Sequence, residues 1–183
     1  MSIVCLGWGS LIWDARELPV TSQWTCDGPE LPVEFARQSS DGRITLVVTE
    51  GATPLSVFFA ELGIASIEDA RAALAARERI SAKFIDRSVG YWSADSISDH
   101  HESCTIGLWA EAAGHDGVVW TALKPRFDER LVTPTGEEIV QYLGALAGET
   151  RRLAEEYIRR TPVEIRTAYR TRIERQLGWT PLE

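Results

Sequence analysis

Apolar residues fall in short runs through the first two thirds of the chain, and the runs are separated by glycine, proline and polar turn residues. Such runs of four to eight residues are typical of β-strands. Ser40, Asp41 and Gly42 supply turn chemistry between two of the runs, which predicts a hairpin there. The pattern predicts strands at 3–6, 33–37, 44–49 and 54–62.

A helix is predicted to begin after Ser66, because Ser66 followed by Asp69 resembles a capping box. The stretch 84–92 is expected to be extended, and the polar stretch 95–103 is expected to be a loop. Two further strands are expected at 104–113 and 116–125, although the pattern over 108–113 also fits a helix.

Helical spacing dominates the last third of the chain. Thr135 and Glu138 form a capping box before an apolar stripe, and Thr161-Pro162 is typical of a second helix start with proline at the first helical position. We therefore expect one α+β domain over 1–183, sheet-rich over 1–125 and helical over 135–178.

The 183 residues fit a single core. The net charge of −8 argues against general affinity for nucleic acid, which needs clustered cations. Positive charge gathers only in 151–183, where arginines alternate with Glu155 and Glu156 at helical spacings. This spacing predicts a solvated, ion-paired helix face. A nucleic-acid or partner contact through this face is the lesser alternative.

Cysteines and histidines give little sign of a metal or disulfide framework. The three cysteines lie far apart and form no Cys-x-x-Cys pair, which favours a reducing compartment. No apolar segment approaches the roughly 18 residues that would span a bilayer, so a cytoplasmic location without membrane association is expected. Cys5, in a predicted buried strand, is expected to be a small core residue rather than a nucleophile. His100-His101-Glu102 is the most metal-like cluster, but adjacent histidines usually point apart, so no metal or cofactor is expected.

The loop after the first strand, Gly7-Trp8-Gly9-Ser10, allows two interpretations. It lacks the third glycine of a dinucleotide-binding fingerprint, because Ile12 stands at that position, and it lacks the glycine spacing of a nucleophile elbow. Two glycines still permit close backbone approach to a ligand, whose anionic group the N–H donors can bind. A plain structural turn explains the same residues.

A carboxylate shares the apolar face of the helix predicted after Ser66. At 100° per residue, Ile67, Leu74 and Glu78 lie on one stripe. Burial raises the pKa of a carboxylic acid, which is how a glutamate becomes a general acid or base near neutral pH. An ion pair with a neighbouring arginine such as Arg77 is the alternative.

These segments together resemble the γ-glutamylcyclotransferase superfamily, especially its ChaC-like, glutathione-degrading branch. The stretch "CLGWGSLIWD" resembles the family's Phe-Gly-Tyr-Gly-Ser-Leu-Ile-Trp segment, with Trp8 in place of the tyrosine. The stretch "FARQSSDGRITLVV" resembles its arginine-containing strand and the strand that follows, and "LAARERI" is similar to the segment that carries the catalytic carboxylate. The resemblance covers about residues 3–92.

The resemblance implies a small mixed β-barrel flanked by helices and a lyase or transferase reaction on a γ-glutamyl amine or peptide. Glu78 matches the catalytic glutamate, which moves a proton while the substrate's own α-amine attacks the γ-carbonyl and releases 5-oxoproline. The residues matched to substrate binding are Trp8, Gly9, Ser10 and Leu11. Arg37 is a further candidate to meet a substrate carboxylate.

A non-catalytic module that keeps the fold and binds a small molecule or a partner is the alternative from another class. Because the substrate supplies its own nucleophile, the proposed reaction needs no cofactor, metal, serine or cysteine. One positioned base and a few backbone donors suffice.

Overall fold

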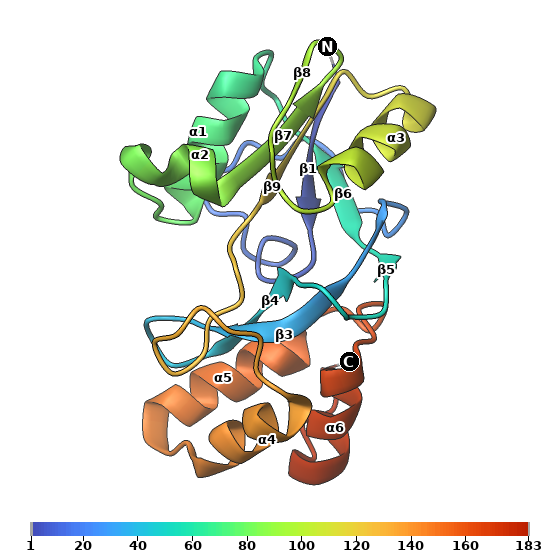
Figure 1. Cartoon of the computed structure of the whole chain (residues 1–183). Helices are drawn as coiled ribbons and strands as arrows, with labels where there is room; N and C mark the ends of the chain where they lie inside the picture. The colour runs from blue at the N-terminus through green and yellow to red at the C-terminus, as the bar shows by residue number, and fades with distance from the viewer. Residues whose placement is uncertain (1, 183) are drawn as a thin grey trace. The chain divides into compact units, whose positions relative to one another are not determined.

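A computed structural model of the chain describes residues 2–182 and has two compact units (Figure 1). The first unit comprises the residues up to 7, 11–31 and 56–123, and the second comprises 8–10, 32–55 and the residues from 124 onward. The chain is mixed α+β, as the sequence predicts, with six α-helices among the described residues. A single domain stays a prediction.

The first unit is built on a five-stranded sheet with the order β6-β1-β9-β7-β8. Its strands are β1 (Ile3–Gly7), β6 (Phe58–Glu61), β7 (Val89–Ser93), β8 (Ser96–Ile97) and β9 (Gly117–Thr121). The central strand pair, β1 and β9, is parallel, and every other neighbouring pair in the sheet is antiparallel. All five residues of β1 are buried, in agreement with the continuous apolar run that predicted this strand.

The sheet of the first unit is open. Its edge strands β6 and β8 do not pair with each other, and no sheet formed by residues 2–182 closes on itself. The small barrel that the resemblance implies is therefore not shown. The strand predicted at 54–62 is divided at Val57 into β5 (Leu55–Ser56) and β6, and β2 (Glu30–Leu31) is a further two-residue strand.

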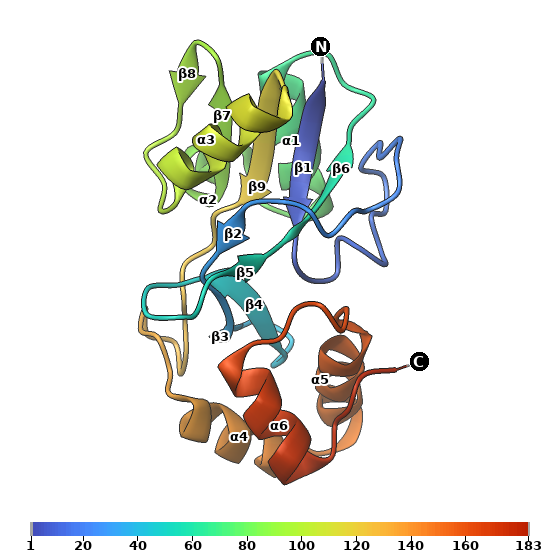
Figure 2. The same ribbon diagram turned by 90° about the vertical axis from the view of Figure 1, so that its right-hand side faces the viewer.

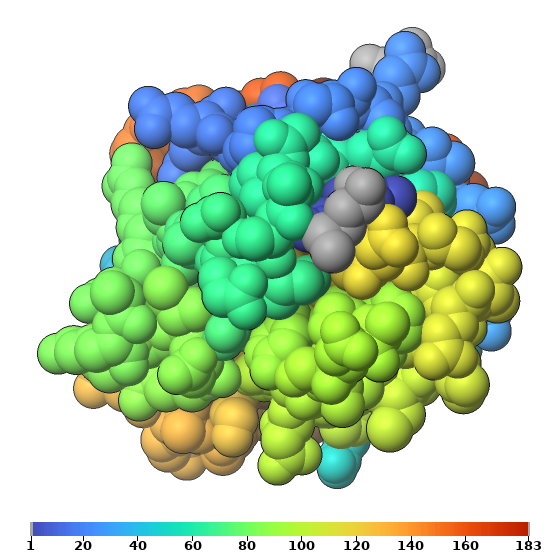
Figure 3. All heavy atoms as spheres, turned by 90° about the horizontal axis from the view of Figure 1, so that it is seen from above, coloured from blue at the N-terminus to red at the C-terminus, as the bar shows by residue number. Residues whose placement is uncertain are grey.

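Helices cover both faces of this sheet. Helix α1 (Ile67–Arg77) packs on the face that carries Ile3, Cys5 and Val119. Helix α3 (Ser103–Ala113) packs on the other face, where Gly107 lies so close to the Trp92 ring that a larger residue would collide with it. Figure 2 shows α3 in front of the sheet and α1 behind it, and Figure 3 shows the surface of the chain from above, much of it formed by residues of this unit.

The second unit is a hairpin with three helices. Strands β3 (Val33–Gln38) and β4 (Ile44–Val48) pair antiparallel as a hairpin, which the turn residues predict. The ladder contains a bulge between Phe35 and Arg37, which was not predicted. The helices are α4 (Gly136–Ala145), α5 (Gly148–Arg160) and α6 (Ala168–Leu177), of which α5 packs on β4 and α6 on β3. The predicted capping box of Thr135 and Glu138 is present at the start of α4.

Buried polar side chains fix the last helix. Glu34, only 4% exposed, accepts a hydrogen bond from the Tyr169 N–H at 3.1 Å and so caps the first turn of α6. The predicted helix start at Thr161-Pro162 is wrong, because the buried Arg170 binds the carbonyl oxygens of residues 161, 162 and 165 and holds this segment outside a helix. Helix α6 begins instead after Thr167, whose hydroxyl accepts from the Arg170 N–H.

Two other secondary-structure predictions need correction. The segment 84–92 is helical at first, in a 3₁₀ turn (Ala82–Phe84) and in α2 (Ile85–Ser88), and becomes extended only in β7. The segment 104–113 is helical throughout, so the strand prediction there is wrong and the helical alternative for 108–113 is confirmed. Within residues 2–182, every helix is too short or too polar to cross a membrane.

Candidate functional site

Glu78 lies at the carboxyl end of α1, where the helix is closed by backbone hydrogen bonds. The Arg79 N–H donates to the Ala76 oxygen and the Ile80 N–H donates to the Ala75 oxygen, which is a Schellman motif. Arg79 takes the left-handed conformation that this motif requires, with φ of 57°. The motif turns the chain immediately after Glu78 and so fixes the position from which its side chain extends.

The carboxylate of Glu78 is held by a buried arginine. Nη1 of Arg77 lies 2.6 Å from Oε1 of Glu78, and the side chains of Arg77 and Glu78 are 3% and 20% exposed. The ion pair with Arg77, weighed at the sequence level as the alternative to a catalytic role, is therefore present. The second carboxylate oxygen of Glu78 has no hydrogen-bond partner among residues 2–182 and is not sealed from solvent.

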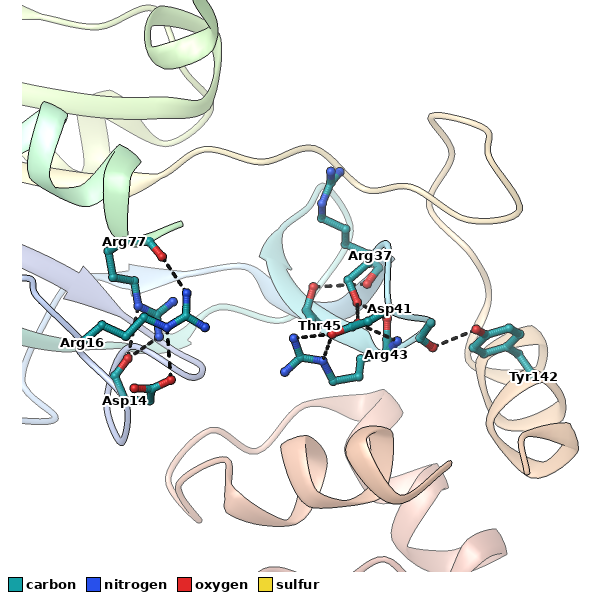
Figure 4. A network of polar contacts seen from close by, with 10 residues as sticks. Asp14, Arg16, Arg37, Asp41, Arg43, Thr45, Arg77 and Tyr142 are labelled. Carbon is teal, nitrogen blue, oxygen red and sulfur yellow. Dashed lines mark hydrogen bonds and ion pairs between the residues drawn. The ribbon is translucent and has the colours of Figure 1, made fainter. Parts of the chain in front are cut away.

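Arg77 also joins the end of α1 to the segment after the glycine loop. Its Nε and Nη2 donate to the backbone oxygen of Asp14, and Nη1 of Arg16 donates to the backbone oxygen of Arg77 at 2.9 Å (Figure 4). Arg16 in turn contacts the Asp14 carboxylate at 3.3 Å. This network orients Glu78 by fixing its ion-pair partner.

Cys5 lies near this carboxylate and is fully buried in β1. Burial raises the pKa of the Cys5 thiol far above its ordinary value, and the negative charge of Glu78 raises it further. A thiolate nucleophile at Cys5 is excluded on these grounds, because the thiol stays protonated at physiological pH.

The loop residues matched to substrate binding are tightly packed. In the first unit, the Leu11 side chain is 5% exposed and belongs to the core beneath α1, so a ligand could use only its backbone. In the second unit, Trp8 is 4% exposed and its Nε1 donates to the Leu46 oxygen at 3.2 Å. The one polar group of Trp8 is therefore already used within the protein.

Gly9 packs against a tyrosine from a distant part of the sequence. A Cβ added at Gly9 would collide with the hydroxyl of Tyr157, a residue of α5. The same hydroxyl accepts a long hydrogen bond of 3.4 Å from the Leu46 N–H. Glycine at position 9 thus leaves room for the Tyr157 side chain. The close approach of a ligand, which is one interpretation of the loop pattern, stays a prediction. Ser10 is partly exposed beside it.

Arg37 lies on the same hairpin as Leu46 and extends away from the ion pair of Asp41 and Arg43 (Figure 4). Nη1 of Arg37 donates to the Lys124 oxygen at 2.7 Å. Burial lowers the pKa of Arg37, and the positive charge of Arg126 lowers it further. Trp8, Gly9 and Arg37 thus all belong to the second unit, where Trp8 bonds to β4, Gly9 packs against α5 and Arg37 lies on β3. Glu78 and Leu11 belong to the first unit.

Two sequence-level candidates remain, the ion-paired helix face and the metal-like cluster His100-His101-Glu102. The ion-paired face of α5 is confirmed by pairs at helical spacing: Arg152 with Glu149 and Glu156, Arg159 with Glu155, and Arg160 with Glu156. Within the described part of the chain, no group of three or more potential ligand residues is placed to hold a metal ion.

Sequence reasoning did not identify Asp14, Tyr157 or Arg126 as part of these arrangements. Asp14 contributes a backbone oxygen, which no side-chain pattern reveals. Tyr157 shares the buried face of α5 with Ala154 and Ile158, so helical periodicity marks it as a packed residue but gives no sign of its contact with Gly9.

No protein-family model matches this chain, and comparison with curated proteins finds no significant relative. The resemblance to a known family is limited to the short segments around Trp8, Arg37 and Glu78.

Proposed function

We propose that this protein is a γ-glutamylcyclotransferase-like enzyme that releases 5-oxoproline from a γ-glutamyl amine or peptide. The observation that supports this most is the state of Glu78: one carboxylate oxygen is fixed by the buried Arg77, and the other has no hydrogen-bond partner among residues 2–182. A carboxylate held in this way is oriented and can still accept a proton. We propose in addition that the chain shares the fold of that superfamily.

In the proposed reaction the substrate supplies its own nucleophile. The α-amine nitrogen attacks the γ-carbonyl carbon, the new C–N bond closes the five-membered ring, and the bond to the leaving amine breaks. Glu78 accepts the proton lost by the attacking nitrogen and returns it to the departing nitrogen, so the reaction needs no water or oxidant. Proton transfer of this kind typically accelerates a reaction by about 10²–10⁴-fold.

Within the first unit, the backbone N–H of Leu11 is the proposed donor to an anionic group of the substrate. A backbone donor fits this task because the side chain of Leu11 is buried in the core beneath α1. Substrate binding by Trp8, Gly9 and Ser10, which belong to the second unit, stays a prediction from the resemblance. The protonated thiol of Cys5 also fits a reaction whose nucleophile belongs to the substrate.

A non-catalytic binding or interaction module is the second candidate, and the ion pair of Arg77 with Glu78 favours it. A pair that ties α1 to the Asp14 segment explains both side chains without any chemistry. Such a module would keep the glycine loop as a ligand-binding backbone.

Turnover measurements separate the two candidates. Wild-type protein is incubated with glutathione and a panel of γ-glutamyl amino acids and amines, and 5-oxoproline is quantified. The Glu78→Gln variant is compared with Glu68→Gln, which removes an exposed carboxylate from the same helix. Release of 5-oxoproline that is lost only in Glu78→Gln supports the enzyme, whereas ligand-induced thermal stabilisation without turnover on any substrate supports the module.

A further inference from the structure

Two arginines of the second unit, Arg37 and Arg126, are direct neighbours in a parallel backbone pairing. The Arg126 N–H donates to the Ala36 oxygen at 3.1 Å, and the Gln38 N–H donates to the Arg126 oxygen at 2.7 Å. Side chains of residues that lie directly opposite each other on paired strands project to the same side. The backbone therefore places two guanidinium side chains next to each other.

Neither of these arginines has an acidic partner within residues 2–182. Nearby arginines do have one, since Arg43 pairs with Asp41 and Arg130 contacts Asp128. Arg37 uses Nη1 on a backbone oxygen, and its Nε and Nη2 make no hydrogen bond to the described residues. Nε and Nη2 of Arg37 are not among the buried polar atoms that lack a hydrogen-bond partner, so these two nitrogens are accessible to a ligand.

The arrangement carries an electrostatic cost that an anion would remove. Arg37 is partly buried, and both its burial and the charge of Arg126 disfavour its protonated form and lower its pKa. Like charges directly opposite each other on paired strands are destabilising. A partly buried cation beside a second cation, with open donors and no acid, is the arrangement expected of a site that binds an anion.

We propose that Arg37 and Arg126 form an oxyanion-binding site in the second unit, which holds a carboxylate or phosphate group of a small ligand. The planar guanidinium presents paired N–H donors that match two oxygens of either group. The half-buried Arg37, held by the Lys124 oxygen, would fix the orientation of the anion, and the exposed Arg126 would supply the second charge.

The sequence predicts that Arg37 meets a substrate carboxylate. The proposed site adds Arg126 as a second cation and includes phosphate among the groups that it can bind. It does not require the cyclotransferase reaction, because none of its contacts involves Glu78. Anion binding that persists in Glu78→Gln, together with loss of 5-oxoproline release, would separate the two proposals experimentally.

The test is calorimetric titration of the full-length protein with inorganic phosphate and with succinate, at an ionic strength held constant with sodium chloride. We expect saturable binding of at least one anion, and the tighter of the two identifies the group that the site prefers. Arg126→Gln and Arg37→Gln should each weaken binding by about tenfold or more, because each removes charge-assisted hydrogen bonds. Arg175→Gln removes an exposed arginine of α6 and should change affinity by less than about twofold.

The melting temperature distinguishes a variant that loses the anion site from a variant that unfolds. In low-salt buffer without phosphate or succinate, Arg126→Gln should melt at a higher temperature than wild type, because one of two repelling charges is gone, while Arg175→Gln should not. Absence of saturable binding of both anions to the wild type would overturn the proposal. Equal affinity in a folded Arg126→Gln would overturn it as well.

Discussion

Replacing Arg77 by methionine perturbs the side chain that orients Glu78. Methionine keeps most of the apolar volume but removes every donor, so the change tests hydrogen bonding rather than packing. The arginine side chain is 3% exposed, and it donates to the Glu78 carboxylate and to the Asp14 backbone oxygen. Both acceptors lose this partner in the variant.

The size of the effect follows from these two losses. A hydrogen bond in which one group is charged contributes about 1.5–3 kcal/mol, and Arg77 makes such bonds to two acceptors, the Glu78 carboxylate and the Asp14 backbone oxygen. We therefore expect Arg77→Met to lower the free energy of unfolding by about 3–5 kcal/mol. For a chain of this length, that corresponds to a fall in melting temperature of about 8–15 °C.

Urea unfolding followed by tryptophan fluorescence measures this loss. Arg71→Met is the matched control, because Arg71 lies on the same helix but pairs with Asp86, whose side chain is 96% exposed, and should cost only about 1 kcal/mol. Arg77→Lys, which keeps the charge, should recover part of the stability. In the proposed enzyme, Arg77→Met should lower kcat more than it changes KM. A stability loss no larger than that of Arg71→Met would refute the reasoning.

Three further predictions concern single side chains. Arg79→Gly should raise the free energy of unfolding by about 0.5–1 kcal/mol in a urea titration, because glycine adopts the left-handed conformation of Arg79 without strain; a lower value would contradict this. Arg170→Met should lower it by about 3–5 kcal/mol, as judged by far-UV circular dichroism, because it removes the donors to three backbone oxygens and to Glu174; an unchanged urea midpoint would show that these bonds are dispensable. Burial lowers the pKa of His115 below 6.5, so the unfolded chain binds more protons there, and wild type should lose stability relative to His115→Asn as the pH falls from 7.5 to 5.5; parallel stability curves for the two proteins would exclude this contribution.

Capping and turn residues predicted the helix starts and the hairpin correctly where the hydrogen bonds that form these features join residues close together in the sequence. Thr135 and Glu138 predicted the start of α4 because both hydrogen bonds of the capping box form within one turn. Ser66 predicted the start of α1 for a similar reason, since its hydroxyl accepts from the Asp69 N–H. The hairpin of β3 and β4 followed from the turn residues between two apolar runs.

The wrong predictions fall where distant contacts decide the local conformation. The segment 104–113 is a helix that packs its Gly107 against Trp92, a contact that no local apolar pattern reveals. The segment after Thr161 is held outside a helix by the side chain of Arg170, which lies nine residues further along the chain. In both cases tertiary packing overrides propensity.

The candidate site was predictable only in part. Glu78 and the glycine loop stood out because a carboxylate shared an apolar stripe and because two short segments resembled a known family. The bond from Arg77 to the Asp14 oxygen spans 63 residues and ends on a backbone atom, so it has no sequence signal. The pairing of Arg37 with Arg126 likewise depends on a bridge between separate segments.

The most direct test of the central claim is the rate of 5-oxoproline release by Glu78→Gln on the best γ-glutamyl substrate of the wild type. The substitution keeps the size of the side chain and a polar contact to Arg77 but removes the proton acceptor. We predict a fall in kcat of at least about 100-fold with the protein still folded, the contribution expected of a general base. An unchanged kcat in the folded variant, or no release of 5-oxoproline by the wild type from any γ-glutamyl compound tested, would contradict the account.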